Sequence, residues 1–282
     1  MMKNLLFLFL LLNLFACKSN VEENEESPIF WKTYDESEEL QAQAEHENPR
    51  MRFKLINSKY LDKNDIWAPF EEDLADFSEE DYSRLKPLIL EKNIPELQKS
   101  RNEGELSYTD LTLFYIYRIR KFESDNDLSL NAIIALNPDA VEQARKLDAE
   151  KPENVDVNSI YGMPILLKDN INTANMPTSA GAIALAENRP SKNAFIAQKL
   201  LEHNALILGK ANLSEWAYFF CDGCPLGYSA VGGQTLNPYG RKVFESGGSS
   251  SGSGVAVAAN YAVAAVGTET AGSILSPSSK NS

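Results

Sequence analysis

The sequence predicts an α/β fold, in which helices and strands alternate along the chain. Residues 163–167 form an unbroken apolar run, which is typical of a strand buried on both faces. Residues 140–147 have helical spacing, and the alanine-rich and valine-rich stretch 254–265 predicts a helix with small side chains that leads to a strand near residues 262–267. Alternation of this kind favours a sheet covered by helices.

Helix-start signals precede this core. Ser78 stands three residues before Asp81, and Ser107 stands three residues before Asp110. This spacing is typical of a helix N-terminus, where the two side chains bind each other's backbone N–H groups. The sequence therefore predicts one helix after Ser78 and another after Ser107.

The amino end has the composition of an export signal. Lys3 is followed from Leu5 by twelve residues that are nearly all apolar, too few for a membrane span of about 20 residues but typical of a signal peptide. The next segment, LFAC, resembles the lipobox of bacterial lipoproteins, which implies cleavage before Cys17 and lipidation of its thiol. We expect an exported lipoprotein anchored to the membrane through Cys17, on the periplasmic or outer-surface side. Cleavage without lipidation is the alternative.

The negative charge of the chain is concentrated near its amino end. The net charge is −13, and 19 of the 40 acidic residues lie between Glu22 and Asp81, against 6 of the 27 basic residues. We expect no nucleic acid partner for a chain with this charge. The expected organisation is a signal peptide over residues 1–16, an acidic tether over 17–52, a helical segment over 53–106 and the main domain over 107–282.

Two turns rich in glycine and serine bracket the predicted small-residue helix. Residues 247–254 read GGSSSGSG, and residues 267–279 read GTETAGSILSPSS. Glycine lets the backbone approach a ligand closely, so such turns bind anions or present a nucleophilic serine. The nucleotide-binding patterns GxxxxGK[ST] and GxGxxG are both absent. A single turn of this kind is often only a tight connection, but two together favour a nucleophile site.

A serine nucleophile needs a base, and the chain offers few. Of its two histidines, His46 lies in an acidic stretch and His203 in a helical pattern before an apolar run, so we expect no histidine triad. Lys168 ends the apolar run 163–167, and burial there would lower its pKa and let the amine accept a proton. The alternative is a lysine at a strand end that faces water.

These motifs occur together in a known family. The segments GMPILLKDNI, GGSSSGSG and GTETAGSILSPSS, in this order, resemble the amidase signature family of serine hydrolases, over about residues 107–279. The resemblance implies a mixed sheet flanked by helices and a catalytic triad of serine, serine and lysine. It implies that Ser273 is the nucleophile, Ser249 a bridging serine after a cis peptide bond, Lys168 the base and Ser250 a supporting residue.

The resemblance also implies an oxyanion hole built from backbone N–H groups, those of Thr270, Ala271, Gly272 and Ser273. Ala271 stands where the family often has glycine, so its methyl group would strain the turn if a positive φ were required there. The implied activity is hydrolysis of a carboxamide C–N bond, in a small molecule or a peptide amide. No cofactor and no metal are expected.

The chain ends soon after the expected nucleophile, so the domain is expected to be truncated there. An incomplete amidase is one hypothesis, and a truncated lipoprotein that is inactive or only binds a ligand is the other. The A subunit of tRNA-dependent amidotransferases shares the motifs, but the predicted signal peptide disfavours it. The pair Cys221 and Cys224 is expected to form a local disulfide or two free thiols without a catalytic role. The oligomeric state and the particular amide are left open.

Overall fold

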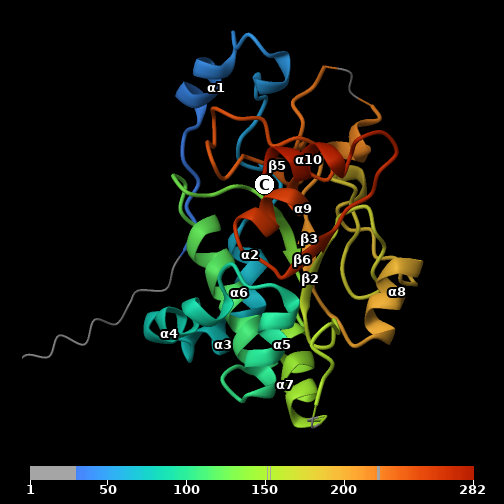
Figure 1. Ribbon diagram of the computed structural model, residues 1–282. Helices are drawn as coiled ribbons and strands as arrows, with labels where there is room; N and C mark the ends of the chain where they lie inside the picture. Colours follow the sequence, from blue (N-terminus) through green and yellow to red (C-terminus); the bar gives the residue numbers. More distant parts are fainter. Residues whose placement is uncertain (1–29, 151, 153, 221–222) are drawn as a thin grey trace, which may run out of the picture.

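The computed structural model describes residues 30–150, 152, 154–220 and 223–282 (Figure 1). The expected signal peptide over residues 1–16 and the expected lipidation site Cys17 lie outside the described residues. Within the described ranges, no helix combines the length and the apolar character that crossing a bilayer requires.

The main sheet of the described chain has four strands in the order β1-β3-β2-β6. Strand β1 is antiparallel to β3, whereas β2 is parallel to both β3 and β6, so the sheet is mixed. The strands are β1 (Ile133–Leu136), β2 (Pro164–Lys168), β3 (Leu206–Ala211) and β6 (Ala264–Val266), and a separate antiparallel pair is formed by β4 (Tyr228–Ser229) and β5 (Gly233–Gln234). The predicted α/β fold with a mixed sheet is confirmed.

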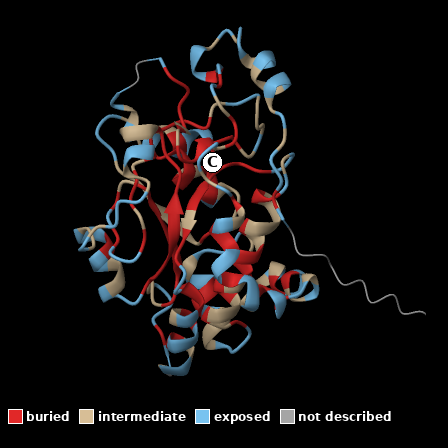
Figure 2. Cartoon of the chain, turned by 180° about the vertical axis from the view of Figure 1, so that it is seen from behind, coloured by how far each residue is buried: buried red, intermediate tan, exposed pale blue. Residues whose placement is uncertain are grey.

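Helices cover both faces of this sheet (Figure 1). Figure 2 shows that burial is concentrated in the central strands and in the helix faces turned toward them. The α-helices are α1 (Ser37–Gln43), α2 (Asn64–Trp67), α3 (Glu71–Ala75), α4 (Glu79–Ile89), α5 (Ile94–Asn102), α6 (Tyr108–Glu123), α7 (Ala140–Glu150), α8 (Phe195–Glu202), α9 (Ser251–Ala258) and α10 (Leu275–Lys280). Short 3₁₀ turns are η1 (Pro49–Met51), η2 (Ala68–Phe70), η3 (Ile183–Leu185) and η4 (Glu215–Tyr218).

Strand β2 is one of the two inner strands of the sheet, and every one of its residues is buried. Successive side chains of a strand point to opposite faces. Leu166 belongs to the large core that includes α6 and α7, whereas Leu167 packs in a smaller core with Ala197 of α8. The predicted buried strand is confirmed, and its last residue is Lys168.

Helix α6, the longest in the described chain, begins at the predicted signal. The Ser107 hydroxyl accepts a hydrogen bond from the Asp110 N–H at 2.9 Å, and the Asp110 carboxylate accepts one from the Ser107 N–H at 3.2 Å. The Ser78 and Asp81 pair caps α4 in the same way. Both helices bury aromatic side chains, and the rings of Tyr82 and Phe114 stack at 4.8 Å between centroids. The two capping signals are therefore confirmed.

The acidic stretch differs from the expectation of a solvated tether over residues 17–52 in the part that is described. Trp31 and Met51 are buried in the core, at 7% and 2% exposure. The Trp31 indole N–H donates to Asn126 Oδ1 at 2.9 Å, and a Glu36 carboxylate oxygen accepts the Asn57 N–H at 2.7 Å. Apolar burial and these hydrogen bonds attach the stretch to the domain.

Candidate active site

Helix α9 carries the first serine-rich turn against the end of strand β3. It begins at Ser251, three residues before the predicted start, and its second residue, Gly252, lies against the backbone of Asn212. A Cβ at Gly252 would lie 2.5 Å from the Asn212 nitrogen, closer than real side chains approach. The Gly252 N–H also donates to the Asn212 carbonyl at 2.9 Å. The predicted small-residue helix that leads to a strand is confirmed, and the helix packs closely on the sheet.

The Lys168 side chain, at the end of β2, is buried and contacts three polar atoms. Its Nζ lies 2.7 Å from Ser249 Oγ, 2.9 Å from Thr268 Oγ1 and 3.2 Å from the Thr268 carbonyl oxygen. The side chain is fully buried, so the alternative of a lysine facing water is wrong. Burial lowers the pKa of the Lys168 ammonium from 10.5 to about 8, because the charged form loses its hydration.

The three oxygens around Lys168 suit a neutral amine. An uncharged Nζ has two N–H groups and one lone pair. Donation to the two Thr268 oxygens leaves the lone pair to accept the Ser249 hydroxyl proton. The neutral Lys168 amine can therefore act as a base through Ser249.

The peptide bond between Gly248 and Ser249 is cis, at the position that the resemblance implied. The Ser249 carbonyl accepts the Ser214 N–H at 3.0 Å. The next residue, Ser250, joins the two serine-rich turns, because its N–H donates to the Ser273 carbonyl at 3.0 Å. The Thr268 N–H donates to the Ser250 hydroxyl at 3.2 Å. Ser250 thus contacts the second turn through both its backbone N–H and its hydroxyl.

Ser273 is half-buried on the second turn. Its carbonyl is held by Ser250, but its hydroxyl makes no hydrogen bond to Ser249, to Lys168 or to any other described residue. The structure therefore brings Lys168, Ser249 and Ser250 together and leaves the Ser273 hydroxyl unattached. Catalytic contacts of this kind often shorten only when substrate binds.

The backbone donors of the second turn divide into two groups. The Gly272 N–H donates to Glu269 Oε1 at 3.1 Å. The N–H groups of Thr270, Ala271 and Ser273 have no partner within the described part of the chain. Gly272 has a φ of +84°, whereas Ala271 is not among the residues with positive φ, so the Ala271 methyl group does not strain the turn.

Sequence reasoning missed three polar residues beside the site. Thr268 contacts Lys168 through both of its oxygens, and Asn170 donates to Thr268 Oγ1 at 3.0 Å. Glu269 accepts the Ile274 N–H at 2.7 Å and the Leu275 N–H at 2.8 Å. The sequence signals for these contacts are limited to position. Thr268 and Glu269 directly follow Gly267, and Asn170 lies two residues after Lys168.

A second buried lysine lies on the opposite face of the sheet. In the β2 and β3 pairing, Leu167 lies opposite Lys210, so the Lys210 side chain points away from the Lys168 side. Lys210 Nζ donates to the Ile171 carbonyl at 2.7 Å and lies 3.9 Å from Asp169 Oδ1. Burial lowers the pKa of Lys210 to about 8, and the nearby Asp169 charge opposes this shift. Lys210 thus holds the loop that follows β2 through its contacts with Asp169 and Ile171.

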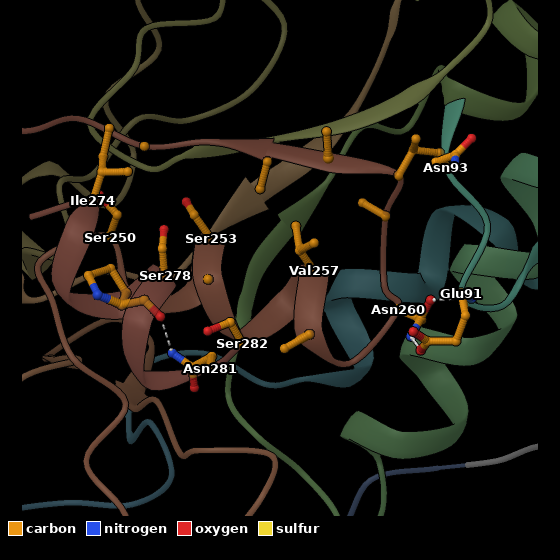
Figure 3. Close-up of a pocket in the computed structure, with 18 of the residues that line it drawn as sticks. Glu91, Asn93, Ser250, Ser253, Val257, Asn260, Ile274, Ser278, Asn281 and Ser282 are labelled. Atoms are coloured by element: carbon orange, nitrogen blue, oxygen red, sulfur yellow. Dashed lines mark hydrogen bonds between the residues drawn. The ribbon is translucent and has the colours of Figure 1, made fainter. Parts of the chain in front are cut away.

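A cavity of about 750 Å³ lies between α9, β6 and α10 (Figure 3). Ser250, Ser253, Ile274 and Ser278 are among its lining residues, but Lys168, Ser249 and Ser273 are not. It therefore lies beside the turn that carries Ser250 and is separate from the lysine contact.

The described residues contain no group of three His, Cys, Asp or Glu side chains that could hold a metal ion. Cys224 is in a disulfide, and Cys221 lies outside the described residues. Of the two alternatives for the cysteines, the structure therefore has a disulfide at Cys224.

Known proteins are similar to this chain in sequence and in fold. Residues 110–282 match the Amidase family. A probable amidase of Arabidopsis thaliana is 41% identical over 197 residues, which make up 69% of this chain and 38% of that protein. An amidase family protein from Bacillus anthracis has a similar structure, with a TM-score of 0.76 and 41% identity over 81% of this chain and 45% of that one. The native peptide amidase of Stenotrophomonas maltophilia gives a TM-score of 0.63 and 46% identity over 68% of this chain and 39% of that one.

The mixed sheet, the buried lysine and the two serine-rich turns define an α/β protein of the amidase type. The chain belongs to the amidase family, as the resemblance indicated. It spans less than half the length of the relatives named above.

Proposed function

We propose that this protein hydrolyses a carboxamide C–N bond, with Ser273 as nucleophile and with Ser249 and Lys168 as a proton relay. The observation that carries the proposal is the 2.7 Å contact between Ser249 Oγ and a fully buried Lys168 whose pKa is lowered to about 8. Family membership supports the reaction type.

The first half of the proposed reaction forms an acyl-enzyme. Ser273 Oγ bonds to the amide carbon while its proton passes to Ser249, and the Ser249 proton passes to the neutral Lys168 amine. The negative charge that develops on the substrate oxygen is bound by backbone N–H groups of the turn over residues 270–273. Breakage of the C–N bond then returns a proton from Lys168 through Ser249 to the leaving nitrogen, which departs as ammonia or an amine.

The second half frees the product. Water attacks the ester on Ser273, the same relay removes and returns one proton, and the carboxylic acid leaves. The mechanism requires the Ser273 hydroxyl to come within hydrogen-bond distance of Ser249 when substrate binds.

The proposed substrate class is a carboxamide, with peptide amides included because a structural relative is a peptide amidase. An inactive or merely ligand-binding chain is the second candidate. The observation that favours it is the absence of a hydrogen bond between the Ser273 hydroxyl and Ser249 within the described ranges.

The test is ammonia release from simple carboxamides and peptide amides by the purified chain. Ser273→Ala and Lys168→Met are expected to lower the rate by about 1,000-fold or more, because each removes one residue of the proposed catalytic triad. Ser279→Ala is the matched control, since Ser279 is an exposed serine of the same motif. A wild-type chain that releases no ammonia from any of these amides would support the second candidate.

For localisation we propose export and membrane anchoring through a lipidated Cys17, on the strength of the sequence LFAC after the apolar run. Cys17→Ser is expected to move the protein from the membrane fraction to the soluble fraction without changing amide hydrolysis. Membrane fractionation that is the same for both forms would contradict the anchor.

A further inference from the structure

Glu269 is bound to the backbone of the turn that carries Ser273. One carboxylate oxygen accepts the Gly272 N–H at 3.1 Å, and the other accepts the Ile274 and Leu275 N–H groups at 2.7 and 2.8 Å. The donors therefore come from residues on both sides of Ser273.

An ionised carboxylate suits this position. It has two oxygens and accepts several hydrogen bonds, each stronger than a bond between neutral groups. These bonds lower the pKa of Glu269, so the side chain is ionised at neutral pH. The residue is exposed, so keeping the charge there requires no counterion.

The same contacts decide which N–H groups of the turn are open. The Gly272 N–H is used by Glu269, whereas the N–H groups of Thr270, Ala271 and Ser273 have no partner among the residues that the structure describes. An oxyanion needs donors that are already in place and unoccupied. The open donors are thus those of Thr270, Ala271 and Ser273.

We propose that Glu269 is a positioning residue, which fixes the backbone from Gly272 to Leu275 and thereby leaves the N–H groups of Thr270, Ala271 and Ser273 as the donors for the oxyanion. The inference rests on the proposed amide hydrolysis. Glu269 itself touches no reacting atom. Its contribution is to hold the nucleophile and the donors in a fixed relative position.

The experiment compares the wild-type chain with Glu269→Ala, Glu269→Gln and Glu269→Asp, and uses Glu142→Ala as the control. Glu142 is an exposed glutamate of α7 that makes no hydrogen bond to the site. Circular dichroism checks that each variant is folded.

The first readout is hydrogen exchange of the peptide that covers residues 270–276, measured by mass spectrometry. Glu269→Ala should accelerate exchange in this peptide, because three backbone N–H groups lose their acceptor. Glu269→Gln should give an intermediate rate, because the glutamine side chain has one oxygen acceptor where glutamate has two. Unchanged exchange in Glu269→Ala would overturn the proposed contact.

The second readout is the rate at which Ser273 reacts with a fluorophosphonate, in which the serine oxygen bonds to phosphorus and fluoride leaves. Glu269→Ala should lower this rate, and kcat for amide hydrolysis, by about 100-fold, because a small displacement of reacting groups is costly. KM should change little, and Glu269→Asp should recover part of the loss because it keeps the charge.

The two proposals fail in different ways. If the wild-type chain hydrolyses amides and Glu269→Ala has an equal kcat, the proposed role of Glu269 is refuted and the proposed function is not. A wild-type chain without hydrolysis and without fluorophosphonate labelling would refute the proposed function, and with it the catalytic part of the Glu269 proposal, whereas hydrogen exchange would still decide whether Glu269 holds the turn.

Discussion

The buried Lys168 should make the stability of the protein depend on pH in a predictable direction. Burial lowers its pKa from 10.5 to about 8 in the folded chain. Between these two values, the unfolded state binds a proton that the folded state does not. The contribution of Lys168 to the free energy of unfolding is therefore lowest below pH 8 and rises as the pH increases toward 10.5. One pKa unit corresponds to about 1.4 kcal/mol, so the full rise is about 3 kcal/mol.

Lys168→Met isolates this effect, because methionine has a similar length and no charge. The variant also loses the hydrogen bonds to Ser249 and Thr268, which adds a constant difference that does not vary with pH. Lys210, whose pKa is also lowered to about 8, contributes equally to wild type and variant. The wild type should therefore gain about 3 kcal/mol relative to Lys168→Met between the low-pH and high-pH limits.

Urea unfolding followed by circular dichroism, from pH 6.5 to pH 10.5, measures this difference. Lys146→Met is the control, because Lys146 is an exposed lysine of α7. That variant should keep the pH dependence of the wild type. If wild type and Lys168→Met have parallel curves over the whole range, the lysine has an ordinary pKa and the base assignment loses its physical support.

Three further predictions concern the same region. The rate of amide hydrolysis should rise with pH and level off above about 8, because the proposed base is the neutral Lys168 amine, and a flat rate between pH 6 and pH 9 would contradict this. Thr268→Val should lower kcat by about 10-fold, because the Lys168 amine loses the hydroxyl acceptor at position 268, whereas Thr268→Ser keeps that hydroxyl and should not lower kcat. Equal kcat values for the two variants in steady-state kinetics would disprove this prediction. Asp169→Asn leaves the buried Lys210 without its ionic partner, so urea unfolding should show a loss of about 3 to 5 kcal/mol, and a loss below about 1 kcal/mol would be too small for a buried pair.

The features that the sequence could predict are those determined by neighbours along the chain. The capping pair of Ser107 and Asp110 depends on a spacing of three residues, and the buried strand β2 depends on an unbroken apolar run. Lys168 was identifiable because it ends that run. The cis bond before Ser249 agrees with the resemblance, which rests on continuous motifs.

The features that the sequence could not predict depend on which segments lie side by side. Thr268 reaches Lys168 because β6 pairs with β2, and Lys210 reaches Asp169 because β3 pairs with β2 on the other side. Neither pairing follows from local patterns. Trp31 ends the short apolar run 29–31 in an acidic stretch, and this run has no helical or strand periodicity, so its burial in the core could not be anticipated.

The alternation of side chains along β2 has a consequence for how this site can change. A shift of β2 by one residue against its neighbours would turn the Lys168 amine toward the α8 layer and put an aliphatic side chain against the cis serine. An insertion or deletion within these five residues should therefore abolish the lysine contact even where the hydrophobic core survives. The position of the proposed proton acceptor therefore depends on the register of β2, which substitutions preserve and which insertions or deletions within the strand shift.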